Sequence, residues 1–130
     1  MKFKVILLVF ISVMALSANA GSITFMCDFP VYVSQTEKEN NADFNIEFHY
    51  DTISTLAFMR GNNGLSKVLA FKGSDGISFI ETLITGAVQT TTIDMLSIEE
   101  GSAEAVHSRH SILFGLFPSQ YYGTCKVTAI

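Results

Sequence analysis

The chain has 130 residues, of which 48% are hydrophobic and 15% are charged, and its formal net charge is −4. This length allows one domain with a modest core. An acidic chain without a basic cluster argues against nucleic-acid binding, which needs several Lys or Arg side chains on phosphates, and against adhesion to anionic membranes.

The first twenty residues have the three parts of a secretory signal peptide. Lys2 and Lys4 form the positive start, residues 5–16 form an apolar run, and residues 18–20 form an A-x-A cleavage site. The run is shorter than the roughly 20 residues that span a membrane. We therefore expect a signal peptide over 1–20, one β domain over 21–130, a periplasmic or secreted location, and no stable membrane insertion after cleavage.

Removal of the signal peptide makes the chain more acidic. Lys2 and Lys4 are two of its eight basic residues, and none of its twelve acidic residues precedes residue 21. Six basic residues then face twelve acidic ones, so the formal charge of the mature domain is −6.

Cys27 and Cys125 are the only two cysteines, and they lie near the two ends of the mature domain. Cysteines of exported proteins usually pair, so we expect a disulfide between them. Such a long closed loop stabilises the fold by up to ~4–5 kcal/mol in the chain-entropy model. The chain has no C-x-x-C pair, which argues against a redox or nucleophilic thiol.

The first part of the domain predicts one strand and one loop. Residues 22–29 are rich in strand-forming types, and Pro30 is expected to end or bend that strand, with residues 31–33 as a short continuation. Residues 34–43 are polar without an apolar period. We interpret them as an exposed loop with room for a helical turn, and as the best candidate for a functional loop.

Residues 44–51 give the clearest strand signal in the chain. Phe44, Ile46, Phe48 and Tyr50 alternate with polar residues. Because side chains alternate across a strand, this segment should have one apolar face and one polar face.

The rest of the chain reads as a series of hairpins. Strands are expected at 56–59, 65–71, 77–84, 88–95, 105–113 and 118–127, with turns at 61–64, 73–76, 85–86 and 99–102. Turns every ~10–12 residues predict an all-β antiparallel meander of about eight strands. We expect a closed or partly open barrel, favoured by the terminal disulfide, with a β-sandwich as the alternative.

The closing hairpin contains the candidate contact residues for a ligand or partner: Arg109, His107, Gln120, Tyr121 and Tyr122. On a regular strand His107 and Arg109 share one face. Pairing across the hairpin would bring Arg109 near a tyrosine or Gln120. Either a cation–π pair fixes the strand register there, or the arginine recognises an anionic group.

An enzyme or metal site has little support in the sequence. A small hydrolase or metal-binding protein using His49 and His107 is the alternative function, with Glu47 and Asp51 beside His49. The zinc-type H-E-x-x-H and paired C-x-x-C spacings, the G-x-S-x-G elbow and the phosphate-binding loop are all absent. We therefore expect no catalytic residues, no metal and no cofactor.

Residues 105–110 and 118–125, which end in Tyr121-Tyr122-Gly123-Thr124-Cys125, resemble small exported bacterial β proteins with a Tyr-x-Gly-Thr-Cys-type ending. The resemblance implies export and a β fold and implies no activity. The chain is also similar in kind to periplasmic inhibitors of c-type lysozyme, which are small disulfide-bearing β-barrels. Their Ser-Gly-x-x-Tyr loop is missing here, and Phe71-Lys72-Gly73 lacks the rest of their second loop. We expect a non-enzymatic domain that binds a protein or small molecule.

Overall fold

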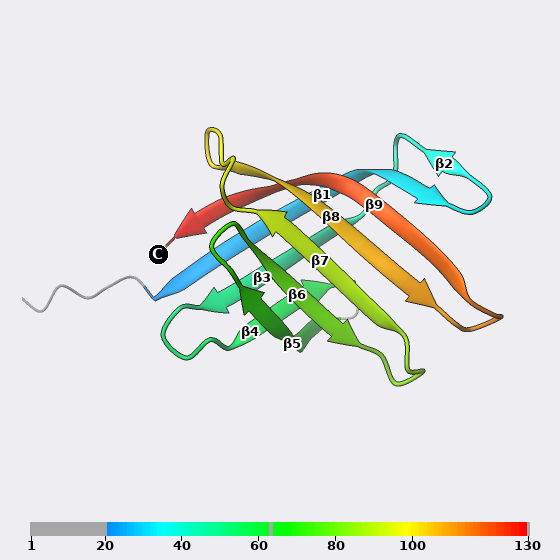
Figure 1. Ribbon diagram of the computed structural model, residues 1–130, viewed down its shortest axis with the longest axis horizontal. Coiled ribbons are helices and arrows are strands. Elements are labelled where there is room, and N and C mark those ends of the chain that lie inside the picture. The colour runs from blue at the N-terminus through cyan, green and yellow to red at the C-terminus, as the bar shows by residue number, and fades with distance from the viewer. Residues whose placement is uncertain (1–20, 63, 130) are drawn as a thin grey trace, which may run out of the picture.

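The computed structural model describes residues 21–62 and 64–129, so the predicted signal peptide lies outside the described residues. Every regular element in the described part is a β-strand (Figure 1). The nine strands are β1 (Ser22–Ser34), β2 (Lys38–Glu39), β3 (Asn45–Asp51), β4 (Ala57–Gly61), β5 (Gly64–Lys72), β6 (Gly76–Thr82), β7 (Val88–Asp94), β8 (Ser102–Ser111) and β9 (Phe117–Ala129). None of the described elements is a helix that could cross a membrane.

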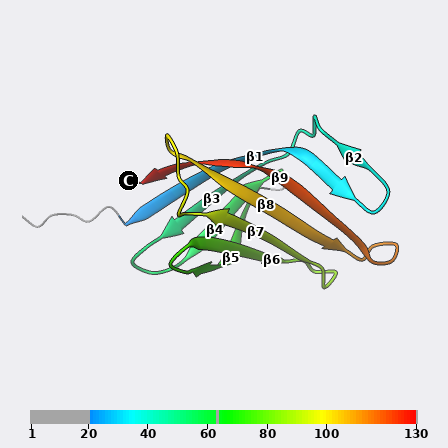
Figure 2. The same ribbon diagram turned by 45° about the horizontal axis from the view of Figure 1, so that its top comes forward.

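Eight of these strands form a closed antiparallel barrel. The order β1-β3-β4-β5-β6-β7-β8-β9 follows the chain, and pairing of β1 with β9 closes the ring (Figures 1 and 2). The predicted meander and the barrel are therefore confirmed, and the β-sandwich alternative is not the fold. Strand β2 is an additional element that pairs only with the end of β1.

The first strand continues past Pro30 over residues 31–33, as one of the two expectations had it, because a bulge carries it past the proline. Asp28 pairs with Thr124 and Val31 pairs with Tyr122, so two residues of β1 lie opposite the single residue Gly123 of β9. A bulge is a position where a strand tolerates proline, which has no N–H to donate to the ladder. The strand consequently has the full length of its partner β9.

The polar segment 34–43 is not wholly a loop and contains no helical turn. Lys38 and Glu39 form β2, paired with Val33 and Tyr32 of β1. The Ser34 hydroxyl accepts the backbone N–H of Glu37 at 3.2 Å, which closes the turn between the two strands. This local bonding overrides the lack of apolar alternation that suggested a loop.

The predicted hairpin turns are confirmed. Gly61 pairs with Gly64, which has a φ of +93°, and Gly86 has a φ of +88° between β6 and β7. Glycine adopts this left-handed backbone without a steric penalty. The strand bounds differ from the expected ones by a few residues.

Phenylalanine side chains fill the middle of the barrel. Phe25, Phe29, Phe48 and Phe79 are each at most 1% exposed. Their rings all point inward, from the neighbouring strands β1 and β3 and from β6, which is not adjacent to either. The barrel therefore has a packed core, and any ligand site must lie at one of its ends or on its outer face.

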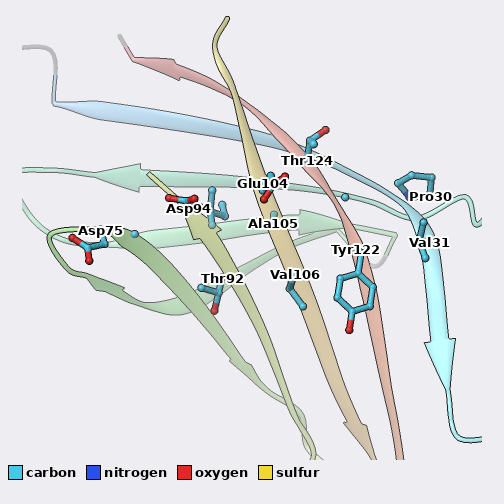
Figure 3. Close-up of a pocket in the computed structure, with 13 residues that line it drawn as sticks. Pro30, Val31, Asp75, Thr92, Asp94, Glu104, Ala105, Val106, Tyr122 and Thr124 are labelled. Carbon is cyan, nitrogen blue, oxygen red and sulfur yellow. The ribbon is translucent and has the colours of Figure 1, made fainter. Parts of the chain in front are cut away.

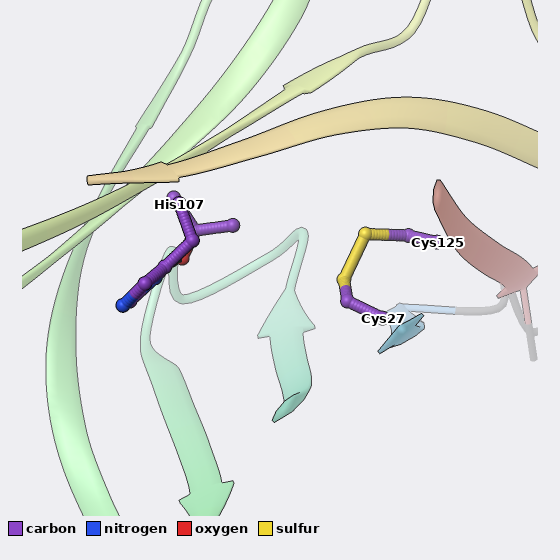
Figure 4. Close-up of a disulfide and its surroundings, with 4 residues drawn as sticks. Cys27, His107 and Cys125 are labelled. Carbon is purple, nitrogen blue, oxygen red and sulfur yellow. Dashed lines mark hydrogen bonds between the residues drawn. A yellow bond between two sulfur atoms is a disulfide. The ribbon is translucent and has the colours of Figure 1, made fainter. Parts of the chain in front are cut away.

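The disulfide lies on the seam where the barrel closes. Cys27 of β1 and Cys125 of β9 are direct register partners with Cα atoms 3.9 Å apart, and their sulfurs are bonded (Figure 4). The predicted pairing is confirmed. A disulfide between buried cysteines is consistent with an oxidising, exported compartment.

Candidate functional site: the barrel end around Arg109

One end of the barrel is formed by four chain connections. The β1–β2, β4–β5, β6–β7 and β8–β9 turns all lie at the same end, because successive antiparallel strands reverse direction (Figures 1 and 2). We call this end the mouth. Its inward-facing polar side chains include Arg109 of β8 and Gln89 of β7, which are direct register partners.

Arg109 lies over two adjacent aromatic rings. Its guanidinium carbon lies 4.7 Å from the centroid of the Phe44 ring and 5.3 Å from that of Tyr121. Nη1 also donates a long hydrogen bond of 3.5 Å to the Tyr121 hydroxyl. Phe44 and Tyr121 pack on each other at 4.4 Å, so the two rings form a platform for the cation.

The charge of Arg109 has no ionic partner. Within residues 21–62 and 64–129, the one pair of a basic and an acidic side chain closer than 4.0 Å joins His49 and Glu47. The Arg109 Nε–H is buried and makes no hydrogen bond to any of the same residues. A half-buried cation usually pairs with an anion. Because no such pair is formed here among the described residues, the guanidinium retains N–H donors that a ligand can use.

Glu81 of β6 lies close enough to feel the Arg109 charge without forming an ion pair. Partial burial raises the pKa of Glu81 above its ordinary value, and the positive charge of Arg109 opposes part of this rise. The carboxyl group therefore ionises less readily than an exposed glutamate.

Three cavities meet at Arg109, which contributes to the wall of each. They have volumes of about 440, 300 and 200 Å³. The first lies toward β2, the second toward the β6–β7 and β8–β9 turns, and the third inside the mouth toward the β4–β5 turn. Arg109 is thus accessible from three directions.

Acidic residues surround the mouth on the β2 side. Glu37, Glu39 and Asp43 line the same cavity as Arg109, and all three are exposed. They lower the electrostatic potential around the single cation. A ligand with several negative charges would be repelled, whereas one carboxylate can approach the guanidinium.

His107 lies one layer deeper than Arg109 on the same face of β8, as the strand alternation predicted. It is 1% exposed, and its Nδ1 is 2.7 Å from the Thr91 hydroxyl. Nε2 is buried and has no hydrogen-bond partner in the part of the chain that the structure describes. Burial, followed by the charge of Arg109, lowers the pKa of His107 to about 4, so the ring is neutral at pH 7.

The predicted contact residues are divided between two surfaces. Arg109 and Tyr121 meet in the mouth and His107 lies in the core beneath them, whereas Gln120 and Tyr122 are exposed on the outer face. The Tyr122 hydroxyl donates to Oε1 of Gln120. The alternation of β9 separates Tyr121 from its two neighbours, so the five residues do not form one site.

The two histidines of the alternative function are also separated. His49 lies on the outer face of β3, with Nε2 2.6 Å from Glu47 Oε1 and Nδ1 3.2 Å from the Thr24 hydroxyl. His107 points into the core. One site cannot use both rings, and the described part of the chain contains no group of three His, Cys, Asp or Glu side chains that could hold a metal ion.

Phe44, Glu81 and Gln89 belong to the site but were not among the predicted contact residues. Phe44 was recognised only as part of an apolar face. Glu81 and Gln89 each stand at inward positions near a strand end, opposite one another in the β6–β7 ladder. The strand register that joins them to Arg109 is the missing information.

Comparison of the chain with protein-family profiles, with curated proteins and with solved structures finds no match.

Proposed function

We propose that this is an exported, non-enzymatic binding domain whose mouth takes a small ligand with one carboxylate, held by Arg109. The proposal is carried by one observation. The Arg109 guanidinium is fixed by two aromatic rings at the junction of three cavities, with no carboxylate within 4.0 Å among the described residues.

The chemistry of arginine favours a carboxylate as the ligand group. The planar guanidinium matches a carboxylate through two parallel hydrogen bonds. Phe44 and Tyr121 cover the guanidinium, so it loses little conformational freedom when it binds. Glu37, Glu39 and Asp43 argue against phosphate esters and polyanions, whose second charge would face these acids.

The dimensions of the mouth favour a small ligand. Drug-sized ligands fill pockets of roughly 300–1,000 Å³. The cavities at Arg109, of about 440, 300 and 200 Å³, are at or below the lower part of that range. The phenylalanine core closes the interior beneath them, which leaves no channel for a long acyl chain.

A periplasmic or secreted location belongs to the same proposal. The Cys27–Cys125 disulfide and the predicted signal peptide both support it. Intact mass spectrometry of the protein from an envelope fraction and from the medium tests it. The expected mass lacks residues 1–20 and two hydrogens. A full-length, reduced chain in the cytoplasm would contradict export.

Ligand binding is tested with N-acetylphenylalanine and its primary amide as probes, followed by amide NMR of the labelled protein. The carboxylate should shift resonances of Gln89, Arg109 and Tyr121, and the amide should not. Because hydrogen bonds to charged groups contribute roughly 1.5–3 kcal/mol, R109Q should weaken binding by more than about tenfold. R109K keeps the charge but loses the paired hydrogen-bond geometry. Its affinity for the carboxylate should therefore lie between those of the original protein and R109Q.

Arg60 provides the matched control. It is the other arginine of the domain and lies exposed on the outer face of β4. R60Q removes the same charge and should leave carboxylate binding unchanged. Equal binding of acid and amide, equal loss in R60Q and R109Q, or no shift at the mouth at millimolar probe would each overturn the proposal. If R109Q does not fold, R109K takes its place, and unchanged affinity of R109K for the carboxylate would contradict the proposal.

A further inference from the structure

A second surface lies on the outer face of the barrel and is independent of the mouth. It is a groove of about 780 Å³ that crosses β7, β8, β9 and β1 and reaches the β5–β6 turn (Figure 3). It is larger than each of the three cavities at Arg109. None of the residues proposed to bind the carboxylate contributes to it.

The floor of the groove is backbone without outward side chains. Ala105 and Ile93 point into the core, and Gly123 has no side chain. A Cβ atom on Gly123 would lie 1.9 Å from the Asp28 carbonyl oxygen, because the β1 bulge presses its backbone onto β9 at this point. Pro30 and Val31 of the bulge line the groove together with Gly123.

One side of the groove is mostly apolar. Val31, Tyr122, Val106 and Thr92 form a continuous row of register partners across four strands, as Figure 3 shows. Tyr122 is 40% exposed, and its hydroxyl is held by Gln120. An exposed aromatic side chain fixed by a hydrogen bond is a typical anchor of a protein interface.

The opposite side is acidic. Glu104 and Asp94 stand on β8 and β7, with Asp75 at the end of the groove (Figure 3). None of the three lies within 4.0 Å of a basic side chain of the described residues. Asp94 Oδ1 accepts the Leu96 N–H at 2.8 Å within its own turn, and Glu104 makes no side-chain hydrogen bond in the described part.

From this complementarity we infer that the groove binds a segment of a partner protein in which a large apolar residue is flanked by Lys or Arg. The apolar residue would pack on Tyr122 and Val106, and the basic side chains would face Glu104, Asp94 and Asp75. A second copy of this chain fits poorly, because a two-fold contact would oppose acidic sides of the same charge. The acidic side likewise excludes nucleic acid and anionic lipid.

The test uses the synthetic peptide acetyl-Lys-Phe-Lys-Leu-Lys-amide and two analogues. One analogue replaces every Lys by Gln, and the other replaces Phe and Leu by Ser. Amide NMR titration of the labelled full domain should locate shifts at Val106, Tyr122 and Thr124 for the parent peptide. Both analogues should bind at least threefold more weakly, and the affinity of the parent should fall as salt is raised.

Variants of the protein separate the two sides of the groove. Since exposed charge pairs contribute roughly 0.2–1 kcal/mol, E104Q should weaken binding about 1.4- to fivefold. Y122A should weaken it about tenfold. E39Q and L65A are the matched controls on exposed positions of β2 and β5, and R109Q tests independence from the mouth. All three should leave the affinity unchanged.

Three results would overturn the inference. They are shifts confined to the mouth, equal affinity of the Gln analogue and the parent, and equal losses in E104Q and E39Q. Absence of any shift at millimolar peptide would overturn it as well. Y122F, which retains the ring and loses only the hydroxyl, should stay within about threefold of the original affinity. If Y122A does not fold, Y122F tests the apolar contact in its place, and a larger loss of affinity would contradict that contact.

Discussion

Phe48 of β3 and Phe79 of β6 stack across the interior of the barrel. Their ring centroids are 4.3 Å apart and their planes differ by 7°. Phe25 of β1 meets the edge of Phe79 at 5.5 Å. The neighbouring strands β1 and β3 are thereby joined to β6, which is not their neighbour in the sheet, through one aromatic cluster. This cluster closes the lumen and limits binding to the mouth and the outer face.

Truncation of this cluster should be costly. We expect F79A to lower the free energy of unfolding by about 3–5 kcal/mol, because it removes a buried ring and leaves a cavity. F114A, at a side chain that is 98% exposed, is the control and should change stability by less than about 0.5 kcal/mol. Urea unfolding measures both, and similar effects at the two positions would contradict the packed core.

Removal of the disulfide should weaken the barrel seam. The bond joins residues 98 positions apart. The variant C27A/C125A should lose about 3–5 kcal/mol of unfolding free energy through the greater freedom of its unfolded chain. Denaturant unfolding with and without reductant measures this loss, and reductant should not affect the variant. Equal stability would mean that the β1–β9 ladder closes the barrel alone.

Gly123 should not tolerate a side chain. A Cβ at this position would lie 1.9 Å from the Asp28 carbonyl oxygen, so G123A must displace the β1 bulge. We expect a loss of more than about 3 kcal/mol or failure to fold. At Gly61, a Cβ would have no neighbour within 4 Å among the described residues, and G61A should be nearly neutral. Thermal unfolding distinguishes the two, and a neutral G123A would contradict the close strand contact.

Stability should depend on the protonation of His107. Its pKa is about 4 in the folded protein and 6.5 in the unfolded chain, so the unfolded chain binds the proton more tightly. This contribution is fully present above pH 6.5 and is lost as the pH falls toward 4, by roughly 2–3 kcal/mol. The measurement is the free energy of unfolding between pH 4 and 7.

The double variant T91V/H107F is the control for this dependence. It replaces both hydrogen-bonding partners by apolar groups, which is often nearly neutral, and it removes the titrating ring. It should lose less stability than the original protein between pH 6.5 and 4. An identical pH profile would show that His107 does not titrate with a lowered pKa.

Glu81 should act in the opposite direction. Its folded-state pKa is raised, so the folded protein binds its proton more tightly, and its contribution to stability falls as the pH rises through its unfolded-state and then its folded-state pKa. E81Q should therefore be more stable than the original protein at pH 7 and show no gain at pH 3. E39Q is the exposed control. A loss of stability in E81Q at pH 7 would mean that attraction to Arg109 outweighs burial.

Strand patterning was predictable where it depends on neighbouring residues. The alternation over residues 44–51 and the glycines of the Gly61–Gly64 turn are local signals, and both agree with the structure. Strand β2 was not predictable, because its two residues are exposed and their pairing with β1 depends on the Ser34 turn. Continuation of β1 past Pro30 over residues 31–33 was expected, whereas the bulge that permits it depends on pairing with β9.

The candidate site was predictable only in part. The alternation of β8 correctly places His107 and Arg109 on one face, and the closing hairpin brings Tyr121 to the arginine. Phe44 comes from the connection between β2 and β3, far away in the sequence, and no local pattern relates it to Arg109. The division of Tyr121 and Tyr122 between the mouth and the outer groove follows from the same alternation, once the inward face of β9 is known.

By itself, the sequence determined the all-β class, the positions of the turns and the pairing of its only two cysteines, because these depend on local backbone preferences and on composition. Only the tertiary structure decided that the barrel closes, that phenylalanines fill it, and that Arg109 lies at its mouth without a carboxylate partner among the described residues. It also decided that the bulge and Gly123 together line the outer groove. These features depend on the register between strands distant in the sequence, which local residue patterns do not specify.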